Sequence, residues 1–334
     1  MSSQLKRPGN LWLLSAAGLL TCALNPEVTA GTVVRFDTVM GSFDVQLFDT
    51  EMPNTVQNFL SYVNTDRYDG TVIHRNSDTF DAGLGAFRDF VIQGGGFSLN
   101  DPDPPDPNAI ISFDNVSLFP SINDEPGGGV AGPSNIRGTI TMAKSGPDTV
   151  TSQYFFNQGD NSFLDNPGRP DGGFSAFGMV LGDGMDVVDA IGDLPLPPDF
   201  GFSISPPFND LPLRNFSGSA INHIRVEHTV TVNSVSQLVL LPGDFDRNGA
   251  VDGDDLAIFS AGFGISEGAF LDDGDADMDG DVDGKDFLIW QQNYGATSSL
   301  SSVNSVPEPA TLLLLCLGAL AKPRAVRLVT RRSN

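Results

Sequence analysis

The stretch from His74 to Phe97 combines a charged donor with an apolar strand and a glycine turn. It begins with the pair His74-Arg75 and ends with the apolar run 90–92, Gln93 and three glycines. A guanidinium beside an apolar strand is costly to bury without a partner. A glycine triplet after a strand lets a ligand or another backbone approach closely. These residues predict a shallow, mostly apolar groove with a few fixed donors, which suits an uncharged peptide.

Three blocks of sequence extend this pattern. They are HR followed by FVIQGGGF, GTITMAKSGPDTVTSQYFFN at 138–157, and FLD followed by FSAFGMVLGDGMDVVDAI within 163–191. Together they resemble the signature of the cyclophilin-type peptidyl-prolyl cis-trans isomerases. The blocks occur in the order found in that family, which makes the match specific, whereas QGGG alone would be a weak signal.

The resemblance implies catalysis of rotation about X–Pro bonds, which is slow because resonance stiffens the C–N bond. The reaction requires no nucleophile, metal or proton transfer, so no cofactor is expected for catalysis. The catalyst must bind the twisted state more tightly than either planar state. In the twisted state the prolyl nitrogen regains its lone pair and becomes a better acceptor. The resemblance assigns the donor near that nitrogen to Arg75.

The resemblance also assigns the rest of the groove, where apolar side chains grip the proline ring and Gln93 binds the substrate backbone. The residues implied for catalysis are Arg75, Phe90, Gln93, Phe155 and Leu164, and those for substrate binding are Val91, Ala143, Gln153, Phe163 and Phe174. Phe163 stands where many eukaryotic members have Trp, and Phe174 where they have His. The alternative is that the aromatic residues are ordinary core and that Arg75 forms a structural ion pair.

Two acidic loops near the C-terminus have the spacing of calcium loops. The first is 244–255 and the second is 275–286. Each places oxygen-bearing side chains at positions 1, 3, 5, 9 and 12 and glycine at position 6, where the loop must bend sharply. The predicted ligands are Asp244, Asp246, Asn248, Asp252 and Asp255 in the first loop, and Asp275, Asp277, Asp279, Asp283 and Asp286 in the second.

The paired loops resemble dockerin type I repeats, because position 12 is Asp rather than the Glu of ordinary EF-hands, and because an apolar helix start follows each loop. The resemblance implies Ca²⁺ binding and a cohesin-like partner. Residues 243–286 contain 14 acidic and two basic side chains, and such a segment repels itself without cations. The alternatives are a disordered acidic linker and a purely structural stalk.

The chain as a whole has a formal net charge of −24. Phosphate binding needs a basic surface, so this charge argues against nucleic acid as a partner. The predicted partners are proline-containing polypeptides.

The elements that must position these groups are mostly short strands. Alternation predicts strands at 32–36 and 42–48, and Pro53 starts a helix with one apolar face. Further strands are predicted at 71–74, 90–93, 138–143, 153–156, 176–181 and 226–232, with a second helix at 185–191. The fold class is therefore mainly β: a closed antiparallel barrel capped by two helices, as the cyclophilin resemblance also implies, plus a small α-helical dockerin/EF-hand-like module.

Three stretches interrupt this pattern and are rich in Pro, Asp, Gly or Phe. They are Asn76–Asp89, Leu99–Pro133 and Gly192–Ser219. Their composition predicts surface loops. The first lies next to the expected groove, where it could contact the substrate.

The two ends of the chain read as targeting segments. Residues 1–30 have the basic start, apolar core and small-residue cleavage site of a signal peptide. At the other end, Val306-Pro307-Glu308-Pro309, an apolar run and a basic tail resemble the PEP-CTERM sorting signal. The alternative is a retained membrane anchor, and either reading implies transient or lasting membrane contact.

The predicted organisation is therefore a signal peptide at 1–30, a cyclophilin-like isomerase domain at 31–235, a dockerin-like calcium-binding module at 241–295, and a Ser-rich linker with a sorting or membrane segment at 296–334. The predicted function is an exported isomerase located in the periplasm, at the cell surface or outside the cell. The main alternative is a non-catalytic protein that binds proline peptides, for adhesion or assembly, on the same scaffold.

Overall fold

The computed structural model describes residues 31–298 except 82, 84, 104 and 126–131. The predicted signal peptide and the PEP-CTERM-like segment lie outside the described residues. The chain divides into two compact units, 1–296 and 297–334, and the elements below belong to the first. No helix within the described part of the chain has the length and hydropathy to cross a membrane.

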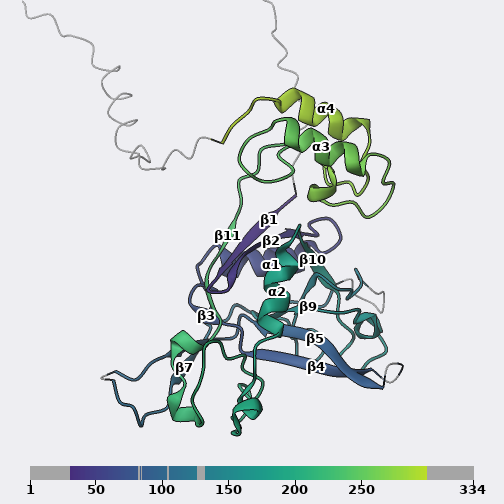
Figure 1. Ribbon diagram of the computed structural model, residues 1–334. Helices are drawn as coiled ribbons and strands as arrows, with labels where there is room; N and C mark the ends of the chain where they lie inside the picture. Colours follow the sequence, from purple (N-terminus) through teal and green to yellow (C-terminus); the bar gives the residue numbers. More distant parts are fainter. Residues whose placement is uncertain (1–30, 82, 84, 104, 126–131, 299–334) are drawn as a thin grey trace, which may run out of the picture. The chain divides into compact units, whose positions relative to one another are not determined.

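An eleven-stranded antiparallel sheet forms most of the described structure, in the order β4-β5-β9-β8-β10-β2-β1-β11-β3-β6-β7 (Figure 1). The strands are β1 (Val33–Thr38), β2 (Gly41–Leu47), β3 (Thr71–Val72), β4 (Arg75–Asp81), β5 (Ala86–Gly94), β6 (Phe97–Asn100), β7 (Ser112–Asn115), β8 (Thr139–Met142), β9 (Tyr154–Asn157), β10 (Ala176–Val180) and β11 (Thr231–Gln237). The fold is thus mainly β, as predicted.

The predicted closure of the barrel is wrong in one respect: within the described residues, no hydrogen-bonded ladder joins the ends of this strand order. The two sides of the sheet are instead joined through the chain itself. Strands β3 and β4, which lie near opposite ends of the strand order, are separated in sequence only by Ile73 and His74. The N–H of Ile73 donates to Val230 O at 2.9 Å, and that of His74 donates to Gln93 O at 3.0 Å. These two bonds face opposite neighbours, so the chain itself connects the two sides of the curled sheet.

Two helices pack against this sheet, as the sequence predicts. Helix α1 (Pro53–Val63) has proline in its first turn and contacts β11, and α2 (Gly184–Gly192) contacts β2. The main core lies between the helices and the sheet. Its largest fully buried side chains include Phe36, Phe59 and Phe177.

The strand predicted at 226–232 is displaced. Residues Val226–His228 form a 3-10 turn, and β11 begins only at Thr231. The turn is held by hydrogen bonds from His228 N to Arg225 O (2.9 Å) and from Thr229 N to Val226 O (3.0 Å). Local turn bonds have therefore replaced the sheet ladder over the first half of an alternating sequence.

The three predicted surface loops contain more structure than their composition indicates. Residues 76–89 form most of the β4–β5 hairpin, whose turn includes Gly85 at φ 66°, a value that favours glycine. Strand β7 lies within 99–133. The segment 192–219 contributes Phe208, Leu211 and Phe216 to a separate buried cluster with Val72. Apolar residues spaced between prolines still bury themselves, so the prediction of surface loops was wrong for these parts.

The C-terminal part folds around two helices, α3 (Gly253–Gly262) and α4 (Gly284–Asn293). Asp252 and Asp283 cap them by accepting from the N–H two residues on, at 2.8 and 2.6 Å, as short acidic side chains do at helix N-termini. The buried cluster around these helices includes Phe259 and Trp290, and it also contains Val33 from β1.

Polar contacts join the same two parts. Asp44 on β2 is nearly buried and accepts from Arg35 on β1 (2.7 and 2.9 Å) and from Arg247 in the first acidic loop (3.0 Å). Leu271 N donates to Gln46 Oε1 at 2.9 Å. The acidic segment is therefore packed against the sheet through a buried carboxylate that needs arginines from both sides.

His74, at the junction of β3 and β4, is 2% exposed and packs edge-on against Phe97 at 4.9 Å between ring centroids. Burial lowers the pKa of this imidazole to about 4, with the Val72 carbonyl opposing the shift and the charge of Arg75 adding to it. The residue is thus neutral and packed at the junction between the two strands.

We expect this histidine to make folding pH-dependent. Its pKa is about 4 when folded and near 6.5 when unfolded, so the unfolded state binds more protons between these values. The neutral His74 contributes its full stabilisation of the folded state above pH 6.5. The free energy of unfolding should fall by up to about 3 kcal/mol as the pH drops to 4. His74→Gln should flatten this slope in urea unfolding measurements. The exposed His223→Gln serves as control, and equal slopes in wild type and His74→Gln would contradict the prediction.

Candidate functional site

A row of directly opposed residues crosses three neighbouring strands of the sheet. Arg75 on β4 pairs with Gln93 on β5, and Gln93 pairs with Phe155 on β9. Opposed residues in an antiparallel sheet project to the same face, so these three side chains lie side by side. Their neighbours Ile92 and Phe156 alternate to the other face and are fully buried in the main core.

The guanidinium of Arg75 is held at three of its nitrogens and stays 39% exposed. Nη1 donates to Gln93 Oε1 at 3.3 Å and Nη2 donates to Ser77 Oγ at 3.1 Å. Nε lies 3.6 Å from Asp210 Oδ2. Gln93 in turn donates from Nε2 to Gln153 Oε1 at 2.8 Å. A chain of polar contacts therefore runs along one side of the row and fixes both amide side chains.

Next to this polar chain lies an apolar cluster made of predicted groove residues. Val91, Phe155 and Leu164 are nearly buried, and Phe90, Ala143 and Phe174 pack against them. The rings of Phe155 and Phe174 meet at 72° with 5.9 Å between centroids. Phe163 is 48% exposed and stacks on Phe90 at 5.8 Å. The structure thus brings all ten predicted groove residues together in one connected set of contacts.

A buried polar network supports the segments that carry the apolar cluster, and nothing in the linear sequence marks it. Asn135 donates from its backbone N (2.9 Å) and from Nδ2 (2.7 Å) to Asp165 Oδ1, and also from Nδ2 to Phe174 O at 2.9 Å, while its Oδ1 accepts from Thr141 at 2.7 Å. Asn161 extends the network by donating to Phe90 O at 2.9 Å. Because fully satisfied buried networks hold one geometry, this one sets the spacing of Phe90, Leu164 and Phe174.

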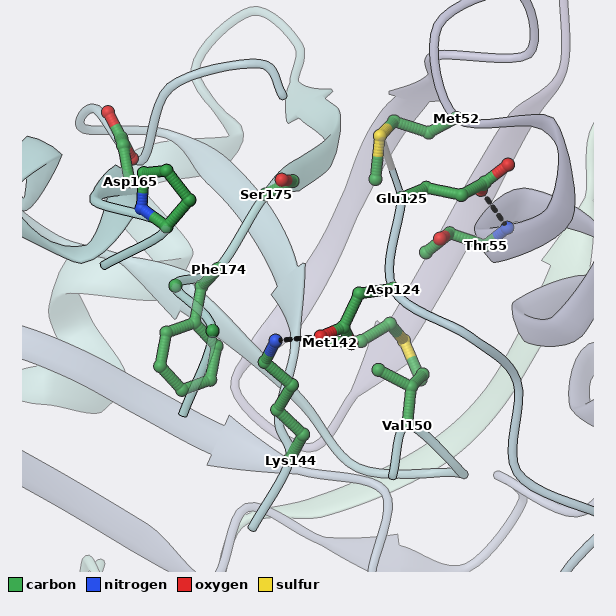
Figure 2. A pocket seen from close by; sticks show the side chains of 13 residues that line it. Met52, Thr55, Asp124, Glu125, Met142, Lys144, Val150, Asp165, Phe174 and Ser175 are labelled. Atoms are coloured by element: carbon green, nitrogen blue, oxygen red, sulfur yellow. Dashed lines mark hydrogen bonds and ion pairs between the residues drawn. The ribbon is translucent and has the colours of Figure 1, made fainter. Parts of the chain in front are cut away.

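Phe174 also lines a small pocket that contains a partly buried ion pair, shown in Figure 2. Lys144 is only 3% exposed, and its Nζ lies 2.6 Å from Asp124 Oδ2 and 5.3 Å from the centroid of the Phe174 ring. Glu125 lies nearby and accepts from Thr55 N at 2.7 Å. Lys144 therefore lies between Asp124 and the ring of Phe174, which is also one of the predicted groove residues.

The acidic loops bring together the carboxylates of positions 1, 3 and 12. Asp244, Asp246 and Asp255 form one cluster, and Asp275, Asp277 and Asp286 form another, with ligand oxygens within 4.8 Å of one another. Asp281 and Asp283 form a further group with Asp286. The predicted ligands Asp252 and Asp279 are outside these clusters. Asp252 caps α3, and Asp279 contacts Lys285. Asn248 Nδ2 donates to Asp246 Oδ2 at 2.8 Å.

The carboxylates at position 1 of the two loops, Asp244 and Asp275, are buried, which is unusual for acidic side chains. Burial raises the pKa of Asp244 to about 6 and that of Asp275 to about 7, and the charges of Asp255 and Asp286 add to these shifts. Asp275 is fully buried, and its Oδ1 has no hydrogen-bond partner among the described residues. A buried, unpartnered carboxylate oxygen is costly, and hard oxygen donors in this arrangement fit a divalent cation such as Ca²⁺. Lys285 lies 2.7 Å from both Asp277 and Asp279.

Comparison with known proteins gives two family matches. The family described as "Cyclophilin type peptidyl-prolyl cis-trans isomerase/CLD" matches residues 33–201, and the "PEP-CTERM protein-sorting motif" matches residues 305–332. The first match covers the groove row, and the second lies outside the described residues.

Several relatives carry an isomerase name. A peptidyl-prolyl cis-trans isomerase of Acinetobacter baylyi is 37% identical over 53% of this chain and 79% of its own. Peptidyl-prolyl cis-trans isomerase A of Dickeya dadantii is 36% identical over 49% and 72%. Peptidyl-prolyl cis-trans isomerase B of Escherichia coli is 34% identical over 48% and 83%.

The buried network should be essential for stability. Asn135→Ala removes a side chain that bonds Asp165, Phe174 O and Thr141, and it leaves buried partners unpaired. We expect the free energy of unfolding to fall by about 1–3 kcal/mol in urea titrations. The exposed Asn233→Ala on β11 should change it by no more than about 0.5 kcal/mol. Equal effects of the two substitutions would show that the network contributes nothing specific.

Proposed function

The chain belongs to the cyclophilin-type peptidyl-prolyl cis-trans isomerase family, and from this premise we propose that Arg75 is the group that accelerates X–Pro rotation. The observation that carries the proposal is the row Arg75, Gln93 and Phe155 beside the cluster of Val91 and Leu164. It combines a fixed cationic donor with an apolar wall on one open face of the sheet.

In this proposal the proline ring of the substrate rests on the apolar cluster, where Phe155 and Leu164 exclude water from it. The guanidinium faces the prolyl nitrogen, which gains a lone pair as the imide twists out of resonance. A donor aimed at charge that appears only in the twisted state lowers the barrier without binding either planar form more tightly. Rotation needs no bond to break, so holding and polarising the imide suffices.

The remaining groove residues take supporting roles. Gln93 has its Oε1 toward Arg75 and its Nε2 toward Gln153, and we propose that this orientation serves the substrate backbone. Phe90, Ala143 and Phe174 complete the apolar wall. The exposed Phe163, stacked on Phe90, extends that wall at the rim. The β4–β5 hairpin, which stands where a surface loop was predicted at Asn76–Asp89, leaves Arg75 partly exposed and is thus compatible with an accessible groove.

The organisation that we propose for the whole chain follows the sequence prediction: a signal peptide at 1–30, an isomerase domain at 31–235, an acidic module at 241–295 and a sorting segment at 296–334. The PEP-CTERM motif suggests export and a membrane-associated C-terminus. We propose that the protein acts on proline-containing clients in the periplasm, at the cell surface or outside the cell.

For the acidic module we propose two Ca²⁺ sites of the dockerin type. The buried Asp275, with one unpartnered oxygen, favours this second function over a purely structural stalk. Loop positions 1, 3 and 12 supply the clustered carboxylates, and Asp252 and Asp279 would turn toward the ion on binding. A cohesin-like partner is part of the same proposal. The exposed apolar residues Leu288, in the middle of α4, and Tyr294, just after its end, are available to it.

Substitution of the guanidinium tests the catalytic role. Arg75→Ala should reduce kcat/KM on a proline peptide by roughly 100-fold or more, by analogy with the loss of one transition-state donor. The far-UV spectrum and melting temperature should change little. Arg214→Ala is the matched control, because that arginine bonds only carbonyls, of Val39 and Glu227, among the described residues. Normal turnover by folded Arg75→Ala would refute the assignment, and retained peptide binding with no turnover in the wild type would favour the non-catalytic alternative.

Calcium binding is tested by calorimetry and thermal unfolding on the purified chain. Two equivalents of Ca²⁺ should bind, and Ca²⁺ at 100 times its Kd should stabilise the module by about 2.7 kcal/mol per site. Asp244→Asn and Asp275→Asn should each remove one site. Asp254→Asn, at loop position 11 of the first site, is the control and should keep both. An identical unfolding curve with Ca²⁺ and with chelator would exclude the sites.

A further inference from the structure

We propose that Asp210 is a positioning residue for isomerisation, because it holds the guanidinium of Arg75 in its working orientation. This inference rests on the catalytic role proposed above for Arg75. Asp210 lies beyond residues 33–201, the part of the chain that matches the isomerase family, and within the segment whose composition predicts only a surface loop. Its carboxylate nevertheless lies at one end of the groove's polar chain, with Oδ2 3.6 Å from Arg75 Nε.

The backbone at Asp210 is fixed from both sides. Its flanking residues Phe208 and Leu211 are buried in the cluster that also contains Val72 of β3. The carbonyl of Asp210 accepts from Asn76 N at 2.7 Å, and the Asn76 side chain donates to Gly192 O. Asn76, the residue after Arg75, thus connects the start of β4 to Gly192 and to Asp210. An anchored carboxylate of this kind can orient a partner, whereas one on a free loop cannot.

The contacts of the guanidinium show what this orientation achieves. Asp210 faces Nε, Gln93 accepts from Nη1, and Ser77 accepts from Nη2. Each terminal nitrogen carries two N–H groups and uses one in its contacts with the described residues, so one on each remains for a ligand. An arginine side chain can adopt several rotamers. Without a partner at Nε, the guanidinium of Arg75 could rotate to a different orientation. Asp210 therefore selects the rotamer that aims the two remaining donors across the groove.

Other acids near the site supply a control for charge alone. Asp78 and Asp89 oppose each other across the β4–β5 hairpin. Burial raises the pKa of Asp78, and so do the charges of Asp89 and Asp210. Asp89 therefore shares the electrostatic surroundings of Asp210. No ion pair between Asp89 and Arg75 is found in the described part of the chain. Removing the Asp89 charge changes the local field without removing a contact to Nε.

A double-mutant cycle on the full chain tests the proposal, with Asp210→Asn, Arg75→Lys and the double variant assayed on a proline peptide by NMR exchange. We expect Asp210→Asn to lower kcat by about 3- to 10-fold with KM nearly unchanged, as befits a partly exposed ion pair. Asp210→Glu should restore most of kcat, and Asp89→Asn should leave it at the wild-type value. In the Arg75→Lys background, which lacks the Nε–H, Asp210→Asn should have no further effect.

Two outcomes would overturn the inference: wild-type kcat in Asp210→Asn, or the same fold loss in the Arg75→Lys background as in the wild type. A fall in melting temperature that accounts for the lost activity, without rescue by Asp210→Glu, would assign Asp210 a purely structural role. Arg75→Ala separates this test from that of the proposed function. If Arg75→Ala is inactive while Asp210→Asn is normal, only the role of Asp210 fails; if Arg75→Ala is fully active, the catalytic assignment itself fails.

Discussion

The backbone N–H of Ile73 donates toward β11, and the next one along the chain, that of His74, donates toward β5. This change of partner brings the two sides of a curled sheet together at one point without a continuous ladder. Arg75 follows immediately as the first residue of β4, so its register with Gln93 is set by the bond that His74 makes to that same residue. The groove depends on this junction, because a slip of one residue would move Arg75 to the core face. The buried, neutral imidazole of His74 packs at this junction against Phe97.

The sequence was sufficient to predict the groove residues that lie in short linear motifs. Arg75, Gln93 and Phe155 are predicted from three motif blocks, and the structure places them in a single row. Helix α1 was predicted because Pro53 and a repeating apolar face are local signals. Asp210 and Asn135 were not predicted, since each acts on groove residues far away in the sequence and has no periodic pattern around it. Only the folded chain brings them to the site.

The wrong predictions share a physical cause. The polar composition of 76–89 predicts a loop. These residues instead form a hairpin, because β4 and β5 pair along their length. In 192–219 the many prolines predict an exposed loop, but Phe208 and Leu211 pack into a buried cluster. At Val226 the alternation is genuine, but turn hydrogen bonds compete with the ladder. A local sequence pattern gives the intrinsic propensity of a segment for helix, strand or turn. The structure that the segment adopts also depends on the residues that pack against it in the folded chain.

In the acidic module, the same carboxylates serve the fold and the proposed ion sites. Asp255 accepts from the N–H groups of Phe245 and Asp252, and Asp286 accepts from those of Ala276 and Asp283. Each therefore closes its loop onto the start of a helix and also belongs to a carboxylate cluster. The resulting crowding of negative charge is tolerable because backbone donors surround it, and a cation would relieve the remainder.

Asp44 has a consequence for how the described part of the chain behaves in solution. This buried carboxylate is shared by Arg35 of the sheet and Arg247 of the acidic loop, and the apolar cluster of the helices takes in Val33. Residues 32–296 should therefore tumble as a single particle with one rotational correlation time, and not as two domains joined by a flexible linker. Cleavage of the short connection after β11 would leave the two fragments associated and would release no free isomerase. An excised sheet domain would keep the pair of Asp44 with Arg35 but would lose the contact with Arg247.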